Sequence, residues 1–131
     1  MIDQAHSIPC VITVTVHSHY LPNTSDPQTH CFNFAYDVKL QHVSGAVGAR
    51  LLHRHWFVMD GHAAVKEVRG IGVVGTQPYL GPGDTFEYTS FVTLNTPIGS
   101  MFGTYEMIAD DGTPFMVEIK AFQLIKHDAV H

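Results

Sequence analysis

Three glycines near the middle of the chain follow the spacing of a dinucleotide-binding loop. Gly70, Gly72 and Gly75 lie directly after Arg69 in the segment VRGIGVVGTQP. In such a loop the glycines permit a tight turn from a strand into a helix, whose N-terminal amides hold a pyrophosphate. Here Gly75 is followed by TQP, which predicts another turn instead of a helix. We therefore expect no Rossmann cofactor.

Two other roles are open to these glycines. On a strand, Gly70 and Gly72 would relieve crowding where the strand bends or packs against Trp56, and we favour this structural role. The alternative is a nest of exposed amides beside Arg69 that binds a small anion, a pyrophosphate or a nucleotide.

Histidine is frequent, with ten residues, and it forms two pairs spaced i, i+2. The pairs are His17 with His19 and His53 with His55. On a strand each pair projects from one face with Cα atoms about 6.6 Å apart, within reach of one divalent metal ion. A closed metal site needs further ligands that the sequence does not fix. The pairs are therefore candidate metal ligands or solvent-facing histidines, and no other cofactor is expected.

The sequence has no motif of a known enzyme active site. It lacks GxSxG, HExxH, a Walker loop and the zinc-deaminase signature. The pair Asp110-Asp111 precedes a glycine, which is typical of a hairpin turn and not of acid–base catalysis. We predict a protein that is not an enzyme.

Charge and hydropathy restrict the partners. Seven basic and twelve acidic residues give a net charge of −5, which disfavours nucleic acids and anionic membranes. The N-terminus lacks a signal-peptide pattern, and no window approaches the roughly 18 to 20 apolar residues of a membrane span. We expect a cytoplasmic protein without membrane insertion, whose two cysteines are reduced.

Alternation of apolar and polar residues predicts that the candidate site residues lie on β-strands. In the first strand Ile12, Val14 and Val16 share one face, opposite His17 and His19. No segment has an apolar stripe at helical spacing, so we predict an all-β fold with about seven strands. A half-polar strand needs a second sheet over its apolar face, which indicates one antiparallel β-sandwich over residues 1–131. The segment LGPGDTFEY resembles the interstrand corner of fibronectin type III domains, which implies a sandwich of the fibronectin type III or immunoglobulin-like type. The expected strands cover residues 10–20, 31–40, 49–59, 65–74, 84–92, 100–109 and 115–125.

Two strands carry irregular apolar patterns. Segment 49–59 is apolar on both faces, and we favour Leu52, Trp56 and Val58 as its inward residues. In segment 115–125 the apolar phase shifts near Lys120-Ala121, as one extra residue in a β-bulge would produce.

An apolar loop follows the fifth expected strand. Phe91, Leu94, Pro97 and Ile98 have no obvious role in a strand, and an exposed loop of this composition would be a partner surface. The alternative is that the loop packs over the end of the sandwich.

Three long segments resemble the bacterial ApaG family. They are RHWFVMDGHAAVKEVRGIGVVGTQPYLGPGDTFEYTS at 54–90, GSMFGTYEMIADDGTPFMVEI at 99–119 and SDPQTHCFNFAYDVKLQH at 25–42. The resemblance implies a fibronectin type III-like sandwich with no established activity, an association with cobalt resistance and magnesium efflux, and nucleotide or pyrophosphate binding at the glycine motif. Related domains in eukaryotic F-box and polymerase-delta-interacting proteins imply a protein-interaction module. The segment VTLN at 92–95 and the histidines at 17, 19, 53 and 62 depart from the family pattern.

We therefore expect a non-catalytic interaction module that binds a partner protein and is linked by resemblance to cobalt and magnesium homeostasis. The alternatives are anion or nucleotide binding at Arg69, Gly70, Gly72 and Gly75, and divalent metal binding by the histidine pairs. The oligomeric state, including a homo-oligomer, is left open by the sequence.

Overall fold

The computed structural model describes residues 8–127, so both ends of the predicted domain 1–131 lie outside the described residues. Nearly all regular structure in this range is strand, with two single-turn 3₁₀ helices at Pro22–Thr24 and Pro27–Thr29. No helix within residues 8–127 is long and apolar enough to cross a membrane. The strands are β1 (Val11–Tyr20), β2 (Phe32–Ser44), β3 (Ala49–Met59), β4 (Val65–Ile71), β5 (Tyr79–Leu80), β6 (Thr85–Leu94), β7 (Ile98–Ala109) and β8 (Pro114–Ile125).

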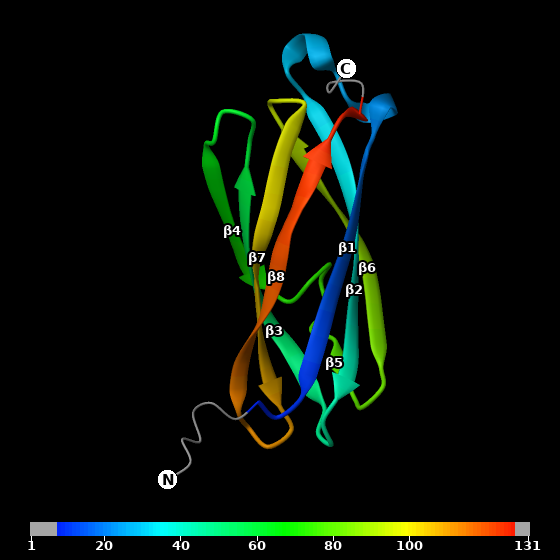
Figure 1. Ribbon diagram of the computed structural model, residues 1–131, viewed down its shortest axis with the longest axis vertical. Coiled ribbons are helices and arrows are strands. Elements are labelled where there is room, and N and C mark those ends of the chain that lie inside the picture. The colour runs from blue at the N-terminus through cyan, green and yellow to red at the C-terminus, as the bar shows by residue number, and fades with distance from the viewer. Residues whose placement is uncertain (1–7, 128–131) are drawn as a thin grey trace.

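These strands form two antiparallel sheets packed face to face (Figure 1). One sheet has the order β1-β2-β6, and the other has the order β4-β3-β7-β8, with β5 paired to β3. Every strand pairing is antiparallel. The prediction of an all-β antiparallel sandwich is confirmed.

The core lies between the sheets and follows from the alternation along the strands. In β2 the inward residues from Phe32 to Leu40 are buried, whereas Asp37 and Lys39 face solvent. Trp56 of β3 lies among the rings of Tyr36 and Tyr105, with edge-to-face geometry and centroids 5.5 and 6.1 Å away. Aromatic pairs of this kind add to the free energy gained by burial alone.

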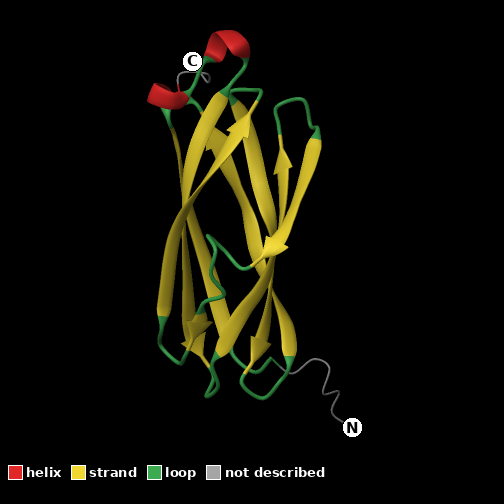
Figure 2. Ribbon diagram, turned by 180° about the vertical axis from the view of Figure 1, so that it is seen from behind, coloured by secondary structure: helices red, strands yellow, loops and turns green. Residues whose placement is uncertain are grey.

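Within the described residues, the sandwich is closed along one side only. On that side β1 packs against β8, and the Ser18 hydroxyl donates to the carbonyl of Gln123 at 2.5 Å. On the other side the edge strands are β4 and β6, and a groove separates them. The segment from β4 to β5 crosses the lower part of this open side (Figure 2).

Two bulges adjust the strand patterns. In β3, Trp56 and Val58 are buried as predicted, but Leu51 is buried in place of Leu52. The β3–β7 register shifts between Leu51 and His53, so Leu52 is the extra residue and the predicted parity was wrong at this position. In β8, Lys120-Ala121 oppose a single residue of β7, which confirms the predicted bulge.

The fourth expected strand is shorter than predicted. Residues 65–74 were expected to be extended, but β4 ends at Ile71. Gly72 then has a φ of +63°, and Val74 and Gly75 have φ values of +42° and +81°. Val73 and Thr76 pair with each other, and Val74 and Gly75 lie between them. The chain therefore makes a tight turn of the type that needs positive φ at both central residues.

Gly103 of β7 provides a test of the packing. A Cβ atom there would overlap the carbonyl oxygen of His55 and lie 3.1 Å from the Cα of Trp56. Because these are backbone atoms of a central strand, we expect Gly103→Ala to lower the free energy of unfolding by about 3 kcal/mol. The measurement is urea unfolding.

Gly81→Ala is the matched control, because the atoms nearest its Cβ would be side-chain atoms, the Asp84 Oδ2 at 3.2 Å and the Tyr79 Cε2 at 3.7 Å. Equal losses in the two variants would contradict this packing.

Candidate functional site

Gly70 makes room for the side chain of Arg54. The two residues are directly opposite each other in the β3–β4 pair, and the guanidinium lies across the glycine. A Cβ on Gly70 would lie 2.6 Å from the Arg54 Cζ. The Arg54 Nη1 then donates to the carbonyls of Ile71 and Gly72, at 3.1 and 2.9 Å. Crowding thus explains Gly70, but the predicted neighbour Trp56 was wrong, because Arg54 occupies the space.

Several amides in the rest of the glycine segment are used internally. The N–H of Gly72 donates to the carbonyl of Leu52 at 2.8 Å, and Val73 and Thr76 exchange two backbone hydrogen bonds. An anion in this segment would compete with these bonds. No helix begins after Gly75, which confirms that the Rossmann arrangement is absent from this segment. Anion binding at Arg69, Gly70, Gly72 and Gly75 stays a prediction.

The two histidine pairs lie in different sheets. His53 and His55 lie in β3, where His53 Nδ1 is 2.6 Å from Glu106 and His55 Nε2 is 2.8 Å from Glu67. His17 and His19 lie in β1, in the other sheet. Within residues 8–127 no three or more His, Cys, Asp or Glu side chains gather as a metal site would require. Metal binding by the pairs stays a prediction.

The structure does bring one histidine pair close to the predicted anion residues. His53, His55, Arg69 and Gly70 line a shallow depression of about 480 Å³ over β3 and β4. Arg69 donates to Glu67 at 3.2 Å. Hydrogen bonds from His55 and Arg69 hold the pKa of Glu67 below its usual range, so its carboxylate neutralises much of the positive charge here.

The predicted surface at Phe91, Leu94, Pro97 and Ile98 is not one apolar loop, because Phe91 and Leu94 lie in β6 and Ile98 begins β7. Leu94 is only 3% exposed and belongs to the core, so its expected exposure was wrong. Pro97 and Ile98 are half-buried, and the amide of Lys126 donates to the carbonyl of Pro97. Phe91 alone is well exposed, at 68%. The loop therefore packs over one end of the sandwich, as the alternative stated.

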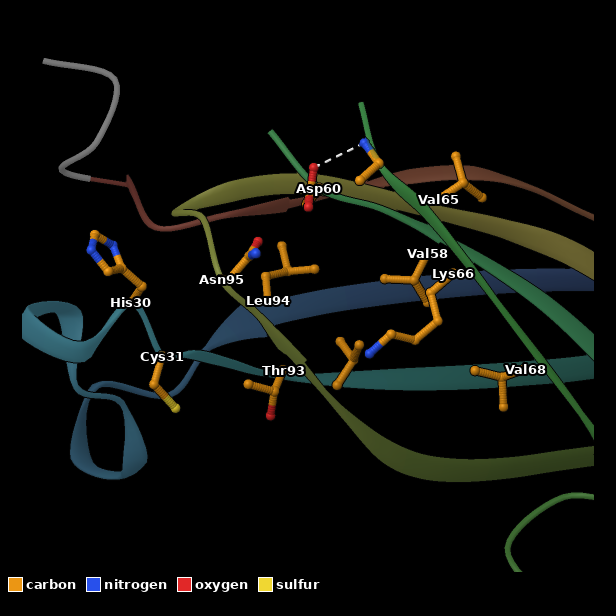
Figure 3. A pocket seen from close by; sticks show the side chains of 12 residues that line it. His30, Cys31, Val58, Asp60, Val65, Lys66, Val68, Thr93, Leu94 and Asn95 are labelled. Atoms are coloured by element: carbon orange, nitrogen blue, oxygen red, sulfur yellow. Dashed lines mark hydrogen bonds between the residues drawn. The ribbon is translucent and has the colours of Figure 1, made fainter. Parts of the chain in front are cut away.

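A groove that the sequence did not reveal runs along the open side of the sandwich. It has a volume of about 590 Å³ and lies between β4 and β6. Val58 and Leu94 are buried at its base, and Lys66 of β4 reaches into it, as Figure 3 shows. The aliphatic lining is completed by Val65, Val68 and Val92.

The outer edge of β4 has backbone groups free to pair. Its inner edge bonds to β3. At the two ends of β4, the Asp60 amide donates to the Ala64 carbonyl and the Gly72 amide donates to the Leu52 carbonyl. Because every second residue of an antiparallel strand bonds to the neighbouring strand, the even-numbered residues between Ala64 and Gly72 bond to β3. The backbone groups of Val65, Glu67, Arg69 and Ile71 therefore point away from β3. Of these, the Ile71 carbonyl accepts from Arg54, and the rest of the edge faces the opening.

Lys66 is the one cation of the groove that lacks a partner within residues 8–127. No carboxylate lies within 4 Å of its ammonium group, and it makes no side-chain hydrogen bond there. The carboxylate of Asp60, near one end of the groove, accepts from the amides of His62 and Ala64 instead. Figure 3 shows the second of these bonds. The sequence VKEVR carries charges on both faces of β4, which is a signal for an edge strand.

The chain is similar to proteins of one family over most of its length. The family model described as the ApaG domain matches residues 22–109. Protein ApaG of Nitrosospira multiformis is 50% identical over 113 residues, covering 86% of this chain and 88% of that protein. Protein ApaG of Bordetella pertussis is 46% identical over 123 residues, covering 94% and 93%.

A solved structure agrees with this assignment. A crystal structure described as an ApaA protein from Bordetella pertussis superposes with a TM-score of 0.86 at 48% identity, covering 89% of this chain and 94% of that one. From its residues, its fold and these relatives, the chain belongs to the ApaG domain family.

Proposed function

We propose that this protein is a non-catalytic interaction module that binds an extended segment of a partner protein along the free edge of β4. The observation that carries this is the coincidence of an unpaired strand edge with an apolar groove. An added strand would pair with the outward backbone groups of β4, and its alternate side chains would enter the groove.

Lys66 indicates the chemistry of the partner segment. A lysine that points inward from an edge strand discourages pairing with arbitrary strands, because its charge would be buried without a counterion. A segment with one carboxylate among its apolar groove-facing residues would neutralise that charge. Lys66 would thus select the partner as well as protect the edge.

Family membership supports a role near cation transport. The ApaG family resemblance links such proteins to cobalt resistance and magnesium efflux, and we place the partner protein in that cytoplasmic process. In this scheme the partner contacts the cation, and the module contacts the partner. The net charge of −5 also favours a protein partner over a nucleic acid.

Charge reversal in the groove tests the partner-binding surface. The chain is used as bait for a cytoplasmic extract, and retained proteins are quantified by mass spectrometry. We expect Lys66→Glu to lower retention of the specific partner by about tenfold or more, because like charges would meet in the groove. Lys120→Glu, at an exposed residue of β8, is the control and should retain the partner. Equal retention by both variants would contradict the proposal.

A proline in the free edge tests strand addition separately from charge. The Arg69 N–H points away from β3, so Arg69→Pro keeps the β3–β4 hydrogen bonds but removes a donor from the free edge. We expect the affinity for the partner to fall about fivefold, with little loss of stability. Arg69→Thr removes the same side chain but keeps the N–H, and it should bind as the unaltered chain does. Affinities that fall equally in both variants would mean that the side chain is the contact.

The cellular role can be tested by growth in cobalt. A strain whose own copy carries Lys66→Glu should be as sensitive to cobalt as a strain that lacks the protein, if partner binding carries the function. A strain with Lys120→Glu should grow like the parent. Sensitivity caused by deletion but not by Lys66→Glu would show that this groove does not serve cobalt resistance.

A further inference from the structure

A second, smaller cavity lies between the two sheets, beside the turn that follows β4. It has a volume of about 190 Å³, and it is lined by Arg54 and Trp56 of β3, Tyr36 of β2, and Tyr88 and Ser90 of β6. Residues 73–75 of the turn complete its wall. It shares no lining residue with the groove between β4 and β6.

Arg54 brings a positive charge to this cavity without a counterion. Its Nη1 is used by the carbonyls of Ile71 and Gly72. No carboxylate lies within 4 Å of its guanidinium among residues 8–127, and its Nε and Nη2 make no hydrogen bond to this part of the chain. A half-buried guanidinium normally has an acidic partner, because removing its charge from water is costly.

The hydroxyl groups around Arg54 also have hydrogens to spare. The side chains of Tyr36 and Ser90 line the cavity, and Tyr88 bonds to Tyr105. In the Tyr88–Tyr105 pair one hydrogen makes the bond and the other needs an acceptor. Tyr105 is fully buried and has no other partner among residues 8–127, so it donates to Tyr88 and leaves the Tyr88 hydrogen for the cavity.

Burial keeps these phenols in the donor state. It raises the pKa of Tyr36, and it raises that of Tyr88 further. Both therefore keep their protons at neutral pH. The cavity then offers phenol hydrogens and guanidinium hydrogens, but no carboxylate.

We propose that this cavity is a binding site for a small oxyanion. A guanidinium binds a carboxylate or phosphate group through parallel charge-assisted hydrogen bonds, and the hydroxyls of Tyr36 and Tyr88 would supply further donors. The volume equals about six water molecules at roughly 30 Å³ each, which suits an ion of phosphate or acetate size and excludes a nucleotide. Gly70 permits the site, because any Cβ there would displace Arg54.

Trp56 makes the proposal testable, because it is the only tryptophan of the chain and it lines the cavity. The full chain is titrated with inorganic phosphate and, separately, with acetate, at an ionic strength held constant with chloride. We expect saturable change of Trp56 fluorescence with at least one anion, and the stronger response identifies the oxyanion. Arg54→Met should abolish it, and Tyr88→Phe should weaken binding about tenfold. Lys39→Met, at an exposed residue of β2, should leave the affinity unchanged.

The outcomes separate this site from the groove. The proposal would be overturned if phosphate and acetate changed the Trp56 fluorescence no more than chloride does. An unchanged response in Arg54→Met would also overturn it. Arg54→Met also removes the hydrogen bonds to the turn after β4, so circular dichroism must show that this variant is folded. Weaker anion binding by Tyr88→Phe provides a second, independent test. Neither variant alters a residue of the groove, so failure here would leave partner binding intact.

Discussion

The structure depends on the fact that its two sheets are joined along one side only. Where β1 packs against β8, the side chains of the two sheets close over the core, and the Ser18 hydroxyl bonds across the junction. Within residues 8–127 the opposite side has no such closure, so β4 and β6 each keep an edge without a partner strand from this part of the chain. The groove and the inner cavity both lie on this open side, one beside the exposed edge of β4 and the other behind the turn that follows it.

Arg54 and Gly70 stabilise that open side. The guanidinium crosses β4 where the glycine has no side chain, and it bonds to the carbonyls at the point where the strand ends. Val73, from the turn beyond, is buried between the sheets. A glycine pattern that resembles a phosphate-binding loop thus has a packing role here, and its positive φ values at Gly72 and Gly75 form a turn instead of a helix N-terminus.

Local sequence patterns were enough to predict most strands and the sandwich, but not the pairing of the strands or the surfaces between the sheets. Alternation in β1 and β2 is a property of neighbouring residues, and the shift at Lys120-Ala121 is visible within one strand. The bulge at Leu52 was missed because both faces of β3 are apolar, so only its pairing with β7 decides which residue is extra. The groove and the Arg54 cavity each need residues from different sheets. Their positions depend on tertiary packing, which periodicity does not encode.

The most direct test of the open side is to measure amide hydrogen exchange rates in the free protein by NMR. If β4 is an unpaired edge, the amides of Glu67 and Arg69 should exchange on the order of tenfold or more faster than those of Val68 and Gly70, which bond to β3. Uniform protection along β4 would show that another strand or a second copy of the chain already covers the edge, and it would contradict a strand that is free to receive a partner.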